Sequence, residues 1–164
     1  RTASLEETQS GVRNKFLVVV DETPECKSAI RFASRRAWHV GGGVILLYVI
    51  EPPEFQHWMG VEQAMREEAR EGAEELLQNL AEEIQKETTI VPEFVIRDGH
   101  KKEEVLALIE EDSDIRVLVL AAHPDTVGPG PLIKSLVGEM SGTFAIPITV
   151  VPGNLTTRQL DAVT

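Results

Sequence analysis

The residues of this sequence that are best suited to chemistry stand in a glycine-rich stretch. His123–Pro131 contains two Gly and three Pro, a composition that predicts a loop. The apolar run Val117–Leu120 precedes it, and Pro131 suits the first position of a helix, where its missing N–H costs nothing. A glycine-rich turn between a parallel strand and a helix N-terminus often binds phosphate in α/β proteins. Recognition of a phosphorylated ligand is therefore the first chemistry to consider.

Two titratable residues also follow apolar runs. Asp21 comes directly after Phe16–Val20, and His123 comes after the run that precedes the loop. If the two strands are neighbours in a parallel sheet, both side chains line one crevice. Ser135 or Ser141 would complete a hydrolytic triad, but no G-x-S-x-G turn is present to expose a nucleophile. The sequence therefore assigns no catalytic residue and does not favour an enzyme.

Other ligand motifs are missing from the sequence. Its four histidines show neither H-x-x-x-H nor H-E-x-x-H spacing, so no metal site is indicated. The P-loop pattern G-x-x-x-x-G-K-[ST] is absent, and no G-x-G-x-x-G follows the first apolar run. The glycine-rich loop before Pro131 is what remains as a candidate ligand site.

The elements that must position these residues are apolar strands alternating with helices. Strands are expected at Phe16–Val20, Val44–Ile50, Thr88–Ile96, Ile115–Leu120 and Ile146–Val151. Helices are expected from Pro24, across Val61–Glu87, around Val105–Ile109 and from Pro131. This alternation predicts a single doubly wound α/β domain, a five-stranded parallel sheet with about four helices on its two faces. Strands one and four should adjoin where ligands bind in such sheets.

Three local features refine this prediction. Thr23 is a good N-cap for the first helix. Pro92 lies inside the expected third strand and indicates an edge strand or a bulge. An apolar stripe along 61–87 indicates a helix face packed on the core rather than a coiled-coil seam, and the many acidic residues of the same stretch indicate a solvated outer face.

Composition limits the partners of the chain. Its 164 residues suit one domain, with flexible tails at 1–14 and 154–164 around a domain at 15–153. A net charge of -11, from 27 acidic and 16 basic residues, argues against nucleic acid or an anionic membrane as partner. Cys26 is the single cysteine, so no internal disulfide forms. No apolar run is long enough to span a membrane, and we expect a cytoplasmic protein.

The order of these segments resembles the universal stress protein family over Lys15 to Pro152. The resemblance rests on FLVVVDETPE, VILLYVIEP, RDGHKKEEVLALIEE and the closing strand, loop, helix and IPITVVPG. It implies the strand order 3-2-1-4-5 and a homodimer joined through the last strand. It also implies a crevice in which many members bind ATP or a related nucleotide and others bind none.

The resemblance also implies which residues would hold a nucleotide. Asp21 and Val49 match the family positions near the ribose and the adenine. Gly128 and Gly138 match the last two glycines of the phosphate motif G-x2-G-x9-G-[ST]. Gly130 is the alternative to Gly128, because the turn is about four residues longer than usual. Asp125 stands where the first glycine is expected. Glu139 stands where the motif has a small hydroxyl residue, so the phosphate half of the site is altered.

These observations leave two functions open. The first is a small dimeric stress-response protein with weak or no ATP binding, which acts as an interaction module for an unidentified protein partner. The alternative is an adenine-nucleotide switch with ATP or AMP in the crevice at the ends of strands 1 and 4. A slow nucleotide hydrolase ranks below both. The apolar stretch Ile148–Val151 on the expected edge strand favours a homodimer in either case.

Overall fold

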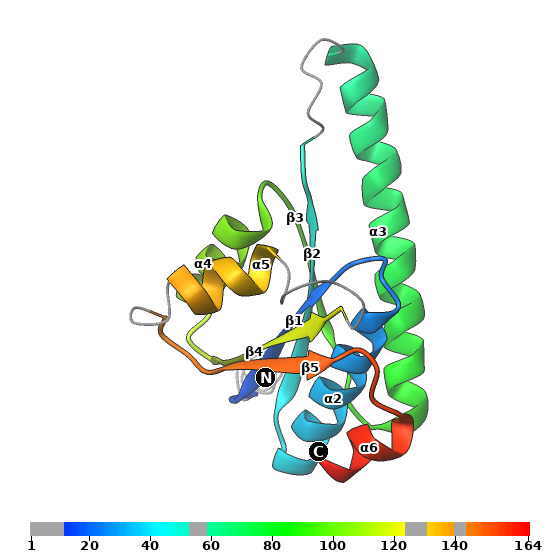
Figure 1. Cartoon of the computed structure of the whole chain (residues 1–164). Coiled ribbons are helices and arrows are strands. Elements are labelled where there is room, and N and C mark those ends of the chain that lie inside the picture. Colours follow the sequence, from blue (N-terminus) through cyan, green and yellow to red (C-terminus); the bar gives the residue numbers. More distant parts are fainter. Residues whose placement is uncertain (1–11, 53–58, 124–130, 140–143) are drawn as a thin grey trace, which may run out of the picture.

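The chain forms one five-stranded parallel sheet. The computed structural model describes residues 12–52, 59–123, 131–139 and 144–164. The strand order is β3-β2-β1-β4-β5, as the sequence predicts (Figure 1). The strands are β1 (Lys15–Val20), β2 (Gly43–Ile50), β3 (Glu93–Asp98), β4 (Ile115–Ala122) and β5 (Ile148–Pro152).

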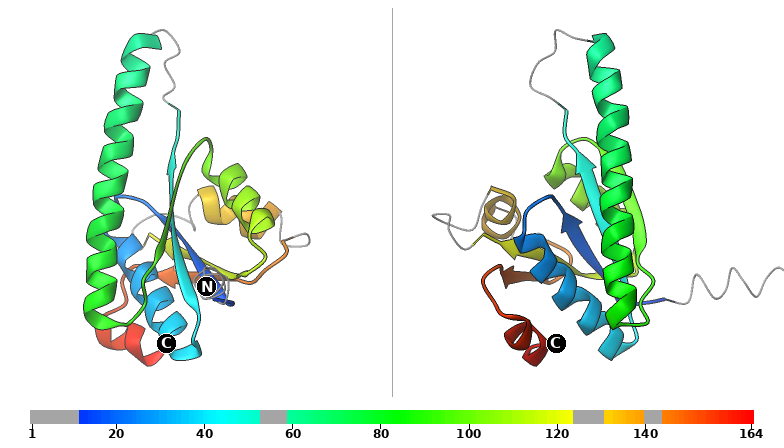
Figure 2. Two further views of the ribbon diagram at one scale, coloured as in Figure 1. Left: turned by 180° about the vertical axis from the view of Figure 1, so that it is seen from behind. Right: turned by 90° about the vertical axis from the view of Figure 1, so that its right-hand side faces the viewer.

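Helices cover both faces of this sheet (Figure 2). One face carries α2 (Glu25–Val40), α3 (Met59–Glu87) and α6 (Thr157–Ala162). The other carries α4 (Lys101–Glu111) and α5 (Pro131–Ile133), which continues as a π-helical turn (Lys134–Glu139). The expected start of the last helix at Pro131 is confirmed. Each face has its own apolar cluster, so the strands between them are buried on both sides.

The central position of β1 follows from its composition. All six of its residues are buried, and it pairs with β2 on one side and β4 on the other. Phe16 lies opposite both Val44 and Val117. A run of apolar side chains with no polar alternation can only be buried on both faces of a sheet. The prediction that strands one and four adjoin is therefore confirmed.

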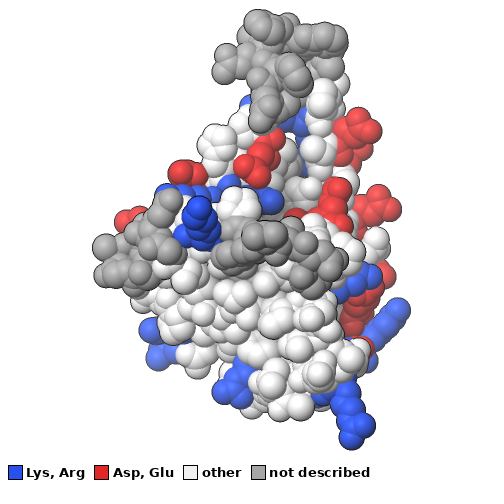
Figure 3. All heavy atoms as spheres, in the orientation of Figure 1, with Lys and Arg blue, Asp and Glu red and all other residues white. Residues whose placement is uncertain are grey.

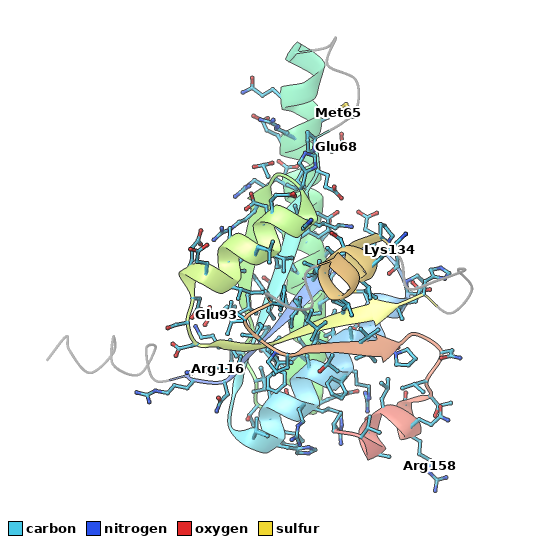
Figure 4. All side chains as sticks on the ribbon, turned by 60° about the vertical axis from the view of Figure 1, so that its left-hand side comes forward. Met65, Glu68, Glu93, Arg116, Lys134 and Arg158 are labelled. Atoms are coloured by element: carbon cyan, nitrogen blue, oxygen red, sulfur yellow. The ribbon has the colours of Figure 1, made fainter. Side chains whose placement is uncertain are left out.

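Helix α3 is packed along its second half and projects beyond the sheet along its first. Ala73, Leu77 and Ile84 are buried against β2 and β3, so the predicted core stripe is correct there. Residues 63–72 are exposed, and Met65 keeps 52% of its surface. Figure 4 labels Met65 on this projecting part.

The third strand starts later than the sequence indicates. The expected strand Thr88–Ile96 begins only at Glu93, because Thr88 ends α3 instead. The Thr88 hydroxyl donates to the Ile84 carbonyl at 2.9 Å and accepts from the Ile90 N–H at 3.2 Å. These bonds fold the chain into a turn before Pro92. The expected edge position of this strand is correct.

Residues 154–164 carry a helix where the sequence analysis expects only a polar tail. Thr156 and Gln159 form a capping box at the start of α6, and Leu160 is buried on the α2 face. The carboxylate of Asp161 accepts two hydrogen bonds from the Arg31 guanidinium, at 2.8 and 2.9 Å. With α6, the described residues hold five α-helices rather than about four. In this part of the chain no helix is long and apolar enough to cross a membrane.

Candidate functional site

A cavity of about 450 Å³ opens at the carboxyl ends of β1 and β4. Its floor is apolar: Val19 and Leu120 are almost fully buried, and Ala121 lies beside them. Leu132 and Ile133 of α5 extend this apolar surface along one wall. Small-molecule sites are typically cavities of roughly 300–1,000 Å³ with apolar linings and a few polar groups. The size and position of this cavity therefore suit a small ligand.

The turn between β1 and α2 holds Asp21 at the edge of the cavity. The Asp21 carboxylate accepts a hydrogen bond from the Thr23 N–H at 2.8 Å and another from the Thr23 hydroxyl. Thr23 is therefore not the N-cap that the sequence suggests: Pro24 takes that position, and no side chain caps the helix. A carboxylate is a stronger acceptor for the hydroxyl than a neutral group. These two hydrogen bonds hold the Asp21 side chain in place where it lines the cavity.

His123 and Glu25 form a second polar group of the same wall. The His123 Nε2 lies 3.5 Å from Oε1 of Glu25, whose side chain is only 12% exposed. Both residues line the cavity with Asp21, so the expected meeting of Asp21 and His123 in one crevice is correct. Gly153, which follows β5, lies so close to Glu25 that an added Cβ would be 2.5 Å from the Glu25 Cγ.

A further wall of the cavity, at the start of α4, carries two lysines together with the carboxylates of Glu51 and Glu103, and nothing in the sequence prediction placed it there. His100, Lys101 and Lys102 line the cavity from the start of α4. Glu51, just after β2, lies 3.8 Å from both the His100 Nδ1 and the Lys101 Nζ. One signal in the sequence could have pointed to this wall. A His-Lys-Lys run at the start of a predicted helix places basic side chains where the helix dipole favours acidic ones, although Glu103 and Glu104 of the same first turn offset that cost.

The remaining candidate residues are not part of the described cavity lining. Val49 is buried in the α4-side core cluster with 5% exposure, and its side chain does not line the cavity. Gly128 and Gly130 lie outside the described residues, as does Asp125. Gly138 and Glu139 end the π-helical turn, and the structure describes only their backbone.

The charges of the lining favour ligands of low negative charge. Among the residues that the structure describes, the ionised groups of the lining are four carboxylates, on Asp21, Glu25, Glu51 and Glu103, and two ammonium groups, on Lys101 and Lys102. With the histidines neutral, four negative and two positive charges leave an excess of two negative charges. Each phosphate charge placed there is repelled by that excess.

Cys26 is buried in the core cluster on the α2 face and is not poised as a nucleophile. Burial raises the pKa of its thiol to about 11. The thiolate is the reactive form of cysteine, so a buried thiol with a raised pKa is a poor nucleophile at neutral pH. Within the described residues, no group of three or more His, Cys, Asp or Glu side chains could hold a metal ion.

Comparison with known proteins identifies a family and a shared fold. The universal stress protein family matches residues 13–152. Universal stress protein UspA from Lactobacillus plantarum is 16% identical, with a TM-score of 0.74 over 86% of this chain and 99% of that chain. A universal stress protein in complex with cAMP is 13% identical, with a TM-score of 0.59 over 88% of this chain and 100% of that chain. The universal stress protein from Archaeoglobus fulgidus in complex with dAMP is 16% identical, with a TM-score of 0.55 over 85% of this chain and 98% of that chain. No curated protein matches the sequence.

Proposed function

Because the chain belongs to the universal stress protein family, we propose that it is a dimeric cytoplasmic stress-response protein that binds an adenine nucleotide. The ligand occupies the cavity at the ends of β1 and β4, and AMP-type ligands bind better than ATP. The observation that carries this proposal is the cavity itself, which joins an apolar floor to polar walls at the switch point of the sheet.

The cavity suits an adenosine group in two respects. Val19, Leu120 and Leu132 offer apolar surface to a flat base. Asp21 offers a carboxylate oxygen as acceptor for a sugar hydroxyl, and its hydrogen bonds with Thr23 keep it in place. Two related structures contain cAMP and dAMP, each with a single phosphate group, which supports ligands of this size.

Electrostatic repulsion disfavours ATP. Two unit charges about 4 Å apart repel by roughly 1 kcal/mol in water and roughly 4 kcal/mol at an effective dielectric of 20. The excess of two negative charges among the described lining residues acts on every phosphate. In this proposal the carboxylate of Glu139 adds to the repulsion, since it replaces a small hydroxyl residue of the family motif. ATP carries more charge than AMP, so its affinity falls further.

Calorimetric titration with adenosine, AMP and ATP tests this function. The wild type should bind AMP more tightly than ATP, and Glu139→Ser should raise the ATP affinity by about ten- to several-hundred-fold. Submicromolar ATP binding by the wild type would contradict the proposal. An unchanged ATP affinity in Glu139→Ser would show that this carboxylate does not face the phosphates.

We also propose that the dimer forms through β5. This strand is a sheet edge, and an apolar edge strand offers unpaired backbone groups to a second copy. Val150 is 38% exposed and Ile148 is partly exposed, on a face with mostly uncharged side chains (Figure 3). The same uncharged edge favours the second candidate function, an interaction module that works without a ligand.

A further inference from the structure

We propose that the outer edge of β3 is a docking site for an extended segment of a partner protein, with apolar side chains on one face of the segment and lysine or arginine on the other. The segment adds to the sheet as a further strand beside β3. This edge is opposite β5, and no residue of β3 belongs to the described lining of the nucleotide cavity. The inference therefore goes beyond nucleotide binding and gives the second candidate function, an interaction module, a surface for its protein partner.

The backbone of β3 is the first argument. Glu93 to Asp98 pair with Ile45 to Ile50 of β2, and within the described part of the chain no strand pairs with the outer side of β3. Alternate N–H and C=O groups of such an edge strand point away from the sheet and have no partner in the ladder. An added strand satisfies these groups as a row, and proteins capture extended peptides at sheet edges in this way.

One face of this edge is apolar and exposed. Phe94 lies opposite Leu46 of the α2-side core cluster, so its ring is on the side of the sheet that α2 and α3 cover. Phe94 keeps 42% of its surface there, and Val91, three residues earlier, keeps 75%. Cross-strand contacts between apolar side chains stabilise a sheet, so these two residues favour apolar residues on the same face of an added strand.

The end of α2 extends this apolar surface. Arg31 of α2 forms an ion pair with Glu87 in the last turn of α3, so the two helices lie side by side at that level. Trp38 follows Arg31 by seven residues, which is two helical turns along the same side of α2. Trp38 therefore lies beyond the end of α3, and its side chain is exposed. Trp and Phe are enriched in protein–protein interfaces, which favours a protein as the occupant.

The other face of the edge carries an excess of carboxylates. Arg97 lies opposite Val49 of the α4-side core cluster, so its side chain is on the side of the sheet that α4 covers. There its guanidinium is shared by the carboxylates of Glu104 and Glu111. Two carboxylates against one guanidinium leave one negative charge beside β3.

Lys15 repeats this arrangement at the start of β3. Its Nζ is 3.0 Å from Oε1 of Glu93 and 3.0 Å from Oδ2 of Asp112, so two carboxylates again share one cation. Together the two clusters hold four carboxylates and two cations, which is an excess of two negative charges. Opposite charges on neighbouring strands stabilise a sheet and like charges destabilise it. This face therefore favours lysine or arginine in the added strand.

A short model peptide of alternating valine and lysine tests the docking site. One control peptide has the same composition with the order Val-Val-Lys-Lys repeated, and the other alternates valine with glutamate. Fluorescence anisotropy should show that the alternating Val-Lys peptide binds about ten-fold more tightly than either control, because it alone has one apolar and one basic face as a strand. Hydrogen exchange should become slower in β3 on binding and stay unchanged in β5.

Phe94→Gln removes the apolar side chain without adding a charge, and it should weaken peptide binding about ten-fold. Val137→Gln is the matched control, since Val137 is exposed to a similar extent, 40%, on the π-helical turn after α5. It should bind the peptide like the wild type. Val91→Gln is a second test at a still more exposed position, where a polar side chain leaves the core unchanged. Thermal unfolding of each variant checks that the fold is kept.

Four outcomes would overturn the proposal. The first is a wild type that does not bind the alternating Val-Lys peptide at millimolar concentration, and the second is equal binding of the control peptides. The third is slower exchange in β5 rather than β3, or unchanged binding in both Phe94→Gln and Val91→Gln. The fourth is a change of oligomeric state in these two variants, measured by sedimentation, because the occupant would then be a second copy of this chain. None of these outcomes bears on nucleotide binding, which the calorimetric titration measures separately.

Discussion

Replacing Gly153 by alanine tests how closely the end of β5 packs on the cavity wall. A Cβ at this position would lie 2.5 Å from Cγ and 2.8 Å from Cβ of Glu25, and 2.9 Å from the carbonyl oxygen of Ala122. The Gly153 N–H donates to that same carbonyl at 3.0 Å, which ties the two backbones together. The Gly153 φ is not in the left-handed region, so the cost arises from space alone. Gly153→Ala must therefore shift the first turn of α2 or the end of β5.

The expected loss of stability in Gly153→Ala follows from overpacking. Adding a methyl group to a well-packed site costs typically about 1–3 kcal/mol. For a protein of this length, each kcal/mol lowers Tm by about 2–4 °C, so Gly153→Ala should lower Tm by about 2–12 °C. Glu25 should also move relative to His123, because its Cγ is the closest atom to the new methyl group.

Gly72→Ala is the matched control for this substitution. Gly72 lies on the exposed part of α3, and a Cβ there would meet no atom within 4 Å. Alanine is preferred to glycine inside a helix by about 0.5–1 kcal/mol. The same chemical change should therefore raise Tm by about 1–4 °C at Gly72 and lower it at Gly153.

Thermal unfolding followed by circular dichroism measures both changes. A Gly153→Ala variant that melts at or above the wild-type temperature would show that Glu25 and Ala122 do not approach this position closely. An equal fall in Tm in Gly153→Ala and Gly72→Ala would also contradict this prediction, because the atoms around the added methyl group would then not decide whether Tm rises or falls.

Three further predictions concern assembly and pH. Val150→Lys should convert the dimer to a monomer in sedimentation, whereas Phe94→Lys on the opposite edge strand should leave it intact; a monomeric wild type at micromolar concentration would contradict the proposed dimer. Burial raises the pKa of Cys26 from its ordinary 9.0 to about 11, so its contribution to stability is complete below pH 9 and is lost as pH rises toward about 11. Urea unfolding should therefore show a smaller alkaline loss in Cys26→Ala than in the wild type, and equal losses would contradict this. Hydrogen bonds from Arg31 hold the pKa of Asp161 below its ordinary 3.8, so the stability it supplies above that value is lost as pH falls through the lowered pKa. Asp161→Asn should unfold more easily than the wild type at pH 7 and show a shallower loss in acid; an unchanged acid profile would show that this pair does not anchor α6.

The site shows where reasoning from sequence succeeds and where it stops. The sequence predicts that Asp21 and His123 share one crevice, because each follows an apolar run and parallel strands end at the same edge of a sheet. The His-Lys-Lys wall was missed because α4 follows the edge strand β3, and the sequence alone does not show that this helix reaches the crevice. Val151 shows the same limit. The apolar stretch Ile148–Val151 lies on an edge strand as the sequence predicts, but Val151 is 2% exposed and belongs to the core, whereas Val150 is 38% exposed and is the position to test for the dimer.

The sequence by itself determined the elements, their alternation and the central position of β1, because apolar runs and helical spacing are local properties that dictate burial. The tertiary structure decided the contacts between distant segments. Examples are the approach of Gly153 to Glu25, the pairing of Arg31 with Asp161 and the placement of Lys101 opposite Asp21. These pairs are separated by 80 to 130 residues. Their contact depends on the crossing direction of each connection and on the packing of helices on a twisted sheet, which no local pattern records.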